Sequence, residues 1–181
     1  MAAPISLESI FTSEKLFGVT TATNVQRAKC RIVAGEPLGD LAKDADVLQM
    51  LGSGDLPVPG ERPSEILDIS AIRVGKSLFA AAFIVWLSQT VDLSGVTRSD
   101  IVRIFVVALK LEGTDAVMTH LVTNLLNKPA LKSLLIDDPK DLTVRTARNN
   151  GLRLRHPSGK IVEVKCIPLD RAGGSGLSVY S

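Results

Sequence analysis

Residues 70–77, with the sequence Ser-Ala-Ile-Arg-Val-Gly-Lys-Ser, come within one glycine of the phosphate-binding pattern Gly-x-x-x-x-Gly-Lys-Ser/Thr. The run Ile66–Ile69 before them has strand character, and the apolar residues from Leu78 onward have helix character. A strand, a loop and a helix in this order direct backbone N–H groups and a helix N-terminus toward an anion. The segment therefore predicts a phosphate-binding loop, with an ordinary turn before a helix as the alternative.

The residue types of this loop match the chemistry of phosphate binding. Gly75 has no Cβ and lets the backbone come close to a phosphate. Lys76 supplies a positive charge for the β- and γ-phosphates, and the hydroxyl of Ser77 is a ligand for Mg²⁺. Ser70 stands where the first glycine belongs and has to adopt the backbone angles of the loop start. We therefore assign Ser70, Gly75, Lys76 and Ser77 to the predicted site.

Length and composition fit one α/β domain and exclude several other classes. The chain has 181 residues, of which 45% are hydrophobic and 22% charged, with a formal net charge of +2. Cys30 and Cys166 lie far apart and form no metal-ligand spacing, so a zinc site is not expected. Neither His120 nor His156 is paired with a nucleophile by any motif. The start lacks a basic signal-peptide region, and the apolar run Leu78–Leu87 is too short to span a bilayer, so a cytoplasmic protein is expected.

Two regions are expected along the chain. Residues 1–63 predict a helical N-terminal segment and linker, with a helix over Leu41–Leu51 and a proline- and glycine-rich stretch after it. Residues 64–181 predict an incomplete P-loop NTPase core, an α/β fold with a parallel sheet flanked by helices. The elements expected there are a strand over 65–69, a helix over about 77–90, a central parallel strand over Arg103–Ala108, a helix that Thr114 caps, and a short helix over Pro129–Ile136.

From Leu142 the hydrophobic period changes from that of a helix to that of a strand. The runs Leu142–Arg148, Leu152–Arg155 and Ile161–Ile167 predict a three-stranded β-meander. Apolar and charged residues alternate in the last two runs, so one face is buried and the other is basic. Four cations are expected to share that basic face: Arg153, Arg155, Lys160 and Lys165. The face is interpreted either as a solvated surface or as a contact for a nucleic-acid backbone.

Taken in order, several stretches resemble the ATPase half of the large terminase subunit of tailed bacteriophages, the motor and nuclease that packages viral DNA. The segment 26–31 with Gly35–Leu38 is similar to the part of that family that contacts adenine. The segment 73–77 resembles the family's variant phosphate loop, which often carries an arginine. Further resemblance lies in Val106–Ala108 and in the region 150–174, which includes a glycine–arginine loop at Arg171.

The resemblance implies a role for several residues. Gln26 would contact adenine, Lys76 and Ser77 would hold phosphate and Mg²⁺, and Arg73 would lie near the γ-phosphate, with Arg171 as a second catalytic arginine. A guanidinium can stabilise the charge that spreads over the phosphate oxygens during phosphoryl transfer. The implied cofactors are ATP and Mg²⁺. The implied partners are double-stranded DNA, the small terminase subunit and the portal, in the cytoplasm of a bacterial host.

One part of the family pattern has no counterpart. P-loop ATPases need an apolar strand that ends in an acid, and the nearest match, Leu134–Asp138, precedes the meander instead of following it. The nuclease domain is also absent. We therefore expect an N-terminal fragment that binds nucleotide and hydrolyses it slowly, with Asp137 and Asp170 as the first candidates for a missed acid. Two alternatives are a non-catalytic interaction module with a vestigial phosphate loop and a small P-loop kinase.

Overall fold

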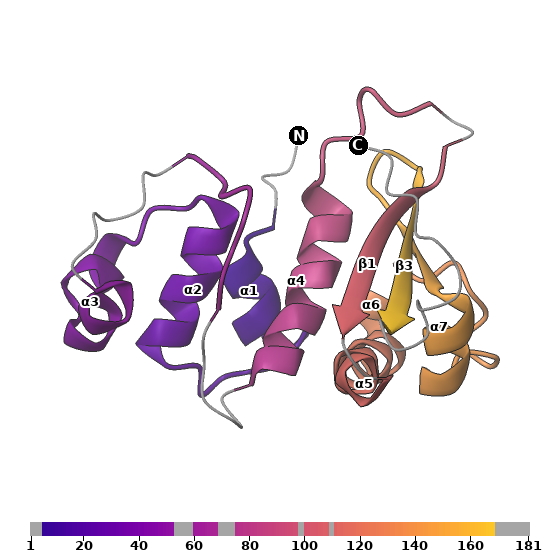
Figure 1. Cartoon of the computed structure of the whole chain (residues 1–181), viewed down its shortest axis with the longest axis horizontal. Coiled ribbons are helices and arrows are strands. Elements are labelled where there is room, and N and C mark those ends of the chain that lie inside the picture. The colour runs from indigo at the N-terminus through magenta and orange to yellow at the C-terminus, as the bar shows by residue number, and fades with distance from the viewer. Residues whose placement is uncertain (1–4, 53–59, 69–74, 98–99, 109–110, 169–181) are drawn as a thin grey trace. The chain divides into compact units, whose positions relative to one another are not determined.

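The computed structural model describes residues 5–52, 60–68, 75–97, 100–108 and 111–168 (Figure 1). The chain divides into two compact units, Met1–Val74 and Gly75–Ser181. Both α-helices and β-strands are present, and all described strands belong to one mixed three-stranded sheet in the second unit. The protein is therefore of mixed α/β class.

The N-terminal unit is helical in its described part, as expected. It contains α1 (Leu7–Thr12), α2 (Asn24–Ala34), the 3₁₀ helix η1 (Gly39–Lys43) and α3 (Ala45–Leu51). One hydrophobic cluster of this unit is formed by four buried side chains of α2, η1, α3 and the turn before η1: Ala28, Leu38, Leu41 and Val47. The single helix predicted over Leu41–Leu51 is divided because Asp44 accepts hydrogen bonds from the backbone N–H groups of Asp46 and Val47 and so caps a new helix.

An ion-pair cluster joins α1, α2 and η1. The carboxylate of Glu8 accepts hydrogen bonds from Arg27 at 2.7 Å and from Arg31 at 2.5 Å, and Arg31 also pairs with Asp40 at 2.9 Å. Burial raises the pKa of Glu8, but the hydrogen bonds and charges of the two arginines outweigh burial and bring the pKa below its usual range. The two arginines thus hold Glu8 in its charged form.

The C-terminal unit packs helices against one face of its sheet. In chain order it contains α4 (Lys76–Thr90), β1 (Val102–Ala108), α5 (Leu111–Asn127), α6 (Pro129–Lys132), α7 (Val144–Asn150), β2 (Leu152–Arg155) and β3 (Ile161–Pro168). The strand order is β1-β3-β2, with β1 parallel and β2 antiparallel to β3. The side chains of Leu152, Leu154, Val162 and Val164 are fully buried on the helix-covered face. The predicted helix over about 77–90 and the predicted strands over Leu152–Arg155 and Ile161–Ile167 are confirmed.

Three expectations about the sheet are wrong. The described residues 65–68 of the strand predicted over 65–69 pair with no strand and belong to the N-terminal unit, where Asp68 forms a 2.8 Å ion pair with Lys29. The strand β1 lies at an edge of the described sheet and not at its centre. The run Leu142–Arg148 mostly forms helix α7, so the second unit has a β-hairpin in place of a meander.

Capping explains why the run 142–148 is helical. Thr143 and Thr146 form a reciprocal capping box at the start of α7, and Gly151 follows the helix with a φ of 81°. Seven residues are too few for periodicity to separate a helix from a strand, so these local hydrogen bonds decide. Two further helix boundaries also differ: α5 begins at Leu111, which places Thr114 inside the helix, and the helix from Pro129 ends at Lys132.

Candidate functional site

The start of helix α4 brings together three of the predicted phosphate-binding residues. Gly75 precedes the helix with φ 83° and ψ 19°, a left-handed conformation that favours glycine. Lys76 is the first helical residue and is exposed, and Ser77 next to it is half-buried. The N–H of Phe79 donates to the carbonyl of Gly75 at 2.9 Å, which closes the first turn. The N–H groups of residues 76–78 precede this bond and are oriented for an anion, as at other helix N-termini.

The body of α4 fixes the position of that first turn. Its sequence is apolar on all sides, and the side chains of Ala81, Ala82, Val85 and Trp86 are almost completely buried. Near its C-terminal end, the side-chain amide of Gln89 donates to the carbonyl of Arg155 at 2.9 Å. A helix held along its length presents its N-terminus in a defined direction.

The first turn of α4 lies toward the carboxyl ends of the parallel strands. Arg155 pairs with Ile161 at the beginning of β3, and this pair lies near the last turn of α4. The helix therefore runs antiparallel to β3, and its N-terminus points to the end where β1 and β3 finish (Figure 1). Open α/β sheets bind ligands at this end of their strands.

The other predicted site residues do not join this group. Ser70, Arg73 and Arg171 lie outside the described residues. Gln26 belongs to the N-terminal unit, where its side chain completes a capping box at the start of α2. Its Oε1 accepts the backbone N–H of Thr23 at 3.0 Å, and its own N–H donates to the hydroxyl of Thr23 at 3.3 Å. A role for Gln26 on adenine stays a prediction.

Gln26 also lines a groove of about 700 Å³ in the N-terminal unit. Val25, Ile32, Leu51 and Ile66 give this groove apolar walls. The Lys29–Asp68 ion pair adds polar groups to its lining. A volume of this size, with apolar walls and a few polar groups, suits a small organic ligand. The sequence did not predict the groove, because the run Ile66–Ile69 has the pattern of a strand. The sequence signal for the groove is the apolar spacing along α2.

Of the four cations predicted to share a basic face, Arg153, Arg155 and Lys165 lie on one face of the sheet by alternation, and Lys160 does not. The ammonium group of Lys160 donates to the carbonyls of Leu93 and Val96 at 2.5 and 2.6 Å, away from that face. Arg153 forms a 2.7 Å ion pair with Asp137, and Lys165 lies 3.5 Å from Glu163. Only Arg155 of the four projects from the strand without a carboxylate partner among the described residues.

Asp137, a candidate for the missed acid, is engaged in holding the β-hairpin. Its carboxylate accepts the backbone N–H of Arg153 at 2.6 Å and the guanidinium of the same residue at 2.8 Å. These two contacts hold the start of β2 against the segment between α6 and α7. The contact gives Asp137 a structural role, while Asp170 lies outside the described residues.

The cysteines have environments that disfavour nucleophilic chemistry. Burial of Cys30 raises the pKa of its thiol to about 12, and burial also raises the pKa of Cys166.

In the described part of the chain, no cluster of three or more His, Cys, Asp or Glu side chains is placed to hold a metal ion. None of the helices in the described ranges has both the length and the apolarity needed to cross a bilayer.

Comparison with known protein families, with characterised proteins and with solved structures finds no match to this chain.

Proposed function

We propose that this protein binds the phosphate groups of a nucleotide at the start of α4, through Gly75, Lys76 and Ser77. One observation carries the proposal: a left-handed glycine, an exposed lysine and a serine open a buried helix at the carboxyl end of a parallel strand pair. The N–H groups of the first turn and the helix dipole attract an anion. The loop sequence before Gly75 fits the same chemistry.

Each residue of the proposed site has a separate role. Gly75 gives the backbone room to approach the β-phosphate, and the ammonium group of Lys76 pairs with the β- and γ-phosphate oxygens. The hydroxyl of Ser77 is the protein ligand for a Mg²⁺ ion that the phosphates also hold. Magnesium and the lysine together neutralise the polyphosphate. ATP, with its three phosphates, offers the most contacts to this arrangement.

The wider proposal is that the chain is the ATP-binding part of a DNA-packaging motor like the large terminase subunit. It is supported by the resemblance of the sequence, which also assigns Gln26 to adenine and Arg73 and Arg171 to the reacting phosphate. In the whole protein, ATP hydrolysis would be coupled to movement of double-stranded DNA in a bacterial cytoplasm. The small terminase subunit and the portal would be its partners. The P-loop NTPase fold is part of this proposal.

A second candidate is an interaction module in which the phosphate loop is vestigial. It is favoured by residues 65–68, which do not form the strand that should precede a phosphate loop. Ser70 in place of the first glycine favours it as well. The two candidates differ in one property, because only the first requires nucleotide binding.

Titration with a fluorescent ATP analogue in the presence of Mg²⁺ separates the candidates. Lys76→Ala removes the charge-assisted hydrogen bond to phosphate, which is worth about 1.5–3 kcal/mol, so we expect affinity to fall by about tenfold or more. Lys132→Ala, at an exposed lysine of α6, is the matched control and should bind like the wild type. Equal affinity of the Lys76→Ala variant and the wild type would rule out the proposed site.

A further inference from the structure

The turn between β2 and β3 brings a histidine ring into direct contact with a serine hydroxyl. The Nδ1 atom of His156 lies 2.7 Å from the Oγ atom of Ser158 and accepts the backbone N–H of the same serine at 3.1 Å. The histidine is 9% exposed, whereas the serine lies at the surface. A surface hydroxyl is thus joined to a buried side chain that is able to accept a proton.

The contacts of the ring determine which of its two nitrogens carries the proton. A backbone N–H is always a donor, so the Nδ1 that accepts it has no hydrogen of its own. The ring proton is therefore on Nε2, and Nε2–H makes the hydrogen bond to the backbone of Val91. The hydroxyl of Ser158 must then be the donor in the 2.7 Å contact. A hydroxyl that donates to a base, with the base oriented by a third group, is the arrangement of an activated nucleophile.

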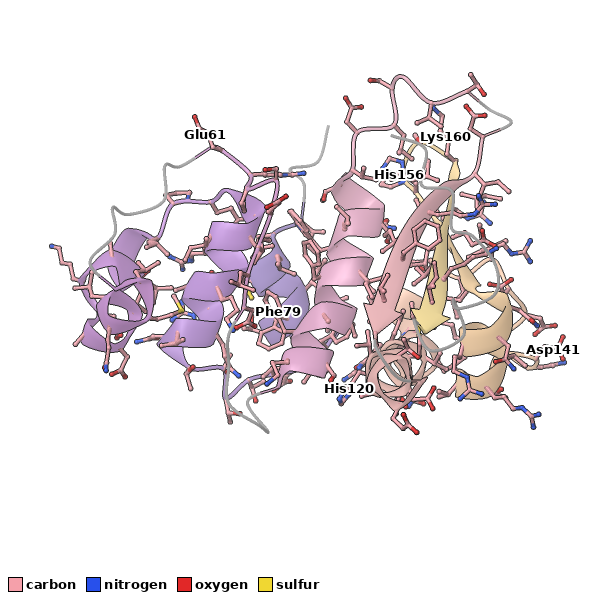
Figure 2. All side chains as sticks on the ribbon, viewed as in Figure 1. Glu61, Phe79, His120, Asp141, His156 and Lys160 are labelled. Atoms are coloured by element: carbon pink, nitrogen blue, oxygen red, sulfur yellow. The ribbon has the colours of Figure 1, made fainter. Side chains whose placement is uncertain are left out.

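Helix α4 and the segment after it hold this turn in place. Val91, which anchors the ring of His156, follows the last residue of α4. Gln89 of the same helix donates to the carbonyl of Arg155, next to the histidine. On the other side of the turn, the ammonium group of Lys160 donates to two carbonyls of the segment between α4 and β1 (Figure 2). The base and the hydroxyl therefore meet in a geometry that the fold fixes in advance.

The backbone donors of the turn limit the kind of electrophile that it could attack. The N–H of Ser158 is used by the histidine ring, and the N–H of Gly159 donates to the carbonyl of His156 at 2.8 Å. An oxyanion that forms at the serine would therefore be stabilised by water and not by these two groups. Only carbonyl groups with a good leaving group react well under that condition. Space is open to them, since a Cβ added to Gly159 meets nothing within 4 Å.

We propose that Ser158 is a nucleophile, with His156 as its general base, and that it accepts acyl groups from activated esters such as thioesters and aryl esters. The Oγ atom forms a bond to the carbonyl carbon while its proton passes to Nδ1. The tetrahedral intermediate then breaks the bond between the carbonyl carbon and the leaving sulfur or oxygen. The leaving group takes the proton from Nδ1, so the imidazole is neutral again and the serine carries an ester.

This site is separate from the proposed nucleotide site. The turn lies where β3 begins, at the end of the sheet opposite to the first turn of α4. A phosphoryl donor fits it less well than an acyl donor, because phosphoryl transfer needs cations that neutralise the phosphate oxygens. Lys160, the cation whose charge acts on His156, already donates to two carbonyls. An uncharged acyl group needs no such cation.

A purely structural contact would close the turn in the same way, and the two interpretations differ in one property. Closing the turn needs only a hydrogen-bond acceptor, as in other turns that a side chain caps. Activating the hydroxyl needs an acceptor that is also a base. A substitution that keeps the acceptor and removes the base therefore separates them.

The test incubates the full chain with p-nitrophenyl acetate at pH 7, where lysine side chains are protonated. We expect a burst of about one equivalent of p-nitrophenolate and an acetyl ester on Ser158, located by mass spectrometry. Ser133 is the internal control, because it is exposed and its hydroxyl donates to the carbonyl of Ala130 at 2.8 Å instead of to a base. It should be acetylated about 100-fold more slowly than Ser158.

Variants identify the role of each residue. Ser158→Ala should lose the burst, and Ser133→Ala should behave like the wild type. His156→Asn supplies an oxygen that accepts the same N–H and hydroxyl but is not a base, so acetylation of Ser158 should slow by about 100-fold while the turn persists. Ser158→Cys should keep a burst, because a thiol beside the same base is the stronger nucleophile. Urea midpoints verify that each variant is folded.

Three results would overturn the proposal. The first is a burst that persists in Ser158→Ala, which would assign the reaction to another group. The second is acetylation of Ser158 in a folded His156→Asn variant at the wild-type rate, which would make the contact structural only. The third needs no variant: equal acetylation rates of Ser158 and Ser133 in the wild type would show that the hydroxyl is not activated.

Discussion

At the scale of single residues, the turn that contains Lys160 and His156 shows how local contacts can change the role that a pattern predicts for a side chain. Both lie at the end of the sheet where β2 turns into β3, and their side chains are labelled close together in Figure 2. Lys160 holds two carbonyl groups of the segment between α4 and β1. Alternation alone placed it on a basic face because a repeating pattern contains no information about a loop that passes nearby.

His156 is the buried titratable group of this turn. Its Nδ1 accepts the backbone N–H of Ser158 at 3.1 Å and lies 2.7 Å from the hydroxyl of the same residue. Burial lowers the pKa of His156, while a hydrogen bond to the backbone of Val91 raises it by less. The neutral imidazole is therefore the form that the folded turn accommodates.

We predict a pH dependence of stability from this histidine. Its folded-state pKa lies below the usual value of 6.5, so the unfolded chain binds a proton more readily. The contribution of His156 to stability is therefore complete above about pH 6.5 and is lost as the pH falls toward the folded-state pKa. Urea denaturation of the wild type and of His156→Gln between pH 5.5 and 7.5 measures it. The variant should show a flatter profile, and two parallel profiles would contradict the assignment.

At the scale of secondary-structure elements, the sequence predicts a helix or a strand best where its hydrophobic pattern is long or regular and no local capping signal opposes it. Helix α4 has a long apolar run, and β2 and β3 have clear alternation, so all three were predicted close to their observed bounds. Helix α7 is short, and its capping box outweighs the alternation. The edge position of β1 was not predictable, because a continuous apolar run indicates burial but does not show which strands exist to cover it.

The beginning of α5 also depends on a contact that no pattern reveals. Gly113 lies in the first turn of this helix, and a Cβ added to it would come within 2.9 Å of the Cβ of Ala108 at the end of β1. Glycine is otherwise unfavourable in a helix. The residue therefore permits a close approach of α5 to the strand before it.

We predict that Gly113→Ala destabilises the protein by about 1–3 kcal/mol, although alanine has the better helix propensity by about 1 kcal/mol. The matched control is Gly95→Ala, where an added Cβ meets nothing within 4 Å, and its effect should stay within about 0.5 kcal/mol. Midpoints of urea unfolding measure both. A Gly113→Ala variant that is more stable than the wild type would show that the strand end moves to accept the methyl group.

At the scale of the whole molecule, the candidate site was predictable only in part. The motif correctly indicated that Gly75, Lys76 and Ser77 would lie at a helix start, because that geometry is local to the sequence. The groove beside Gln26 was not predictable, since it is formed by segments far apart in the chain. The contact in the turn between β2 and β3 was not predictable either, because the sequence does not show which nitrogen of a histidine ring accepts a hydrogen bond. These two sites belong to different units, and each has a chemistry that a phosphate loop does not explain.

The account rests on the proposal that nucleotide phosphates bind at the first turn of α4. Backbone ¹⁵N–¹H NMR of the full chain, titrated with Mg²⁺ and ATP, tests it at the level of single amides. We predict that the largest shifts occur at Gly75, Lys76, Ser77 and Leu78, that adenosine without phosphates leaves these four amides in place, and that Lys76→Ala weakens the response by about tenfold. Unchanged amides at 75–78 in the presence of saturating Mg²⁺ and ATP, or shifts confined to other parts of the chain, would contradict the central claim.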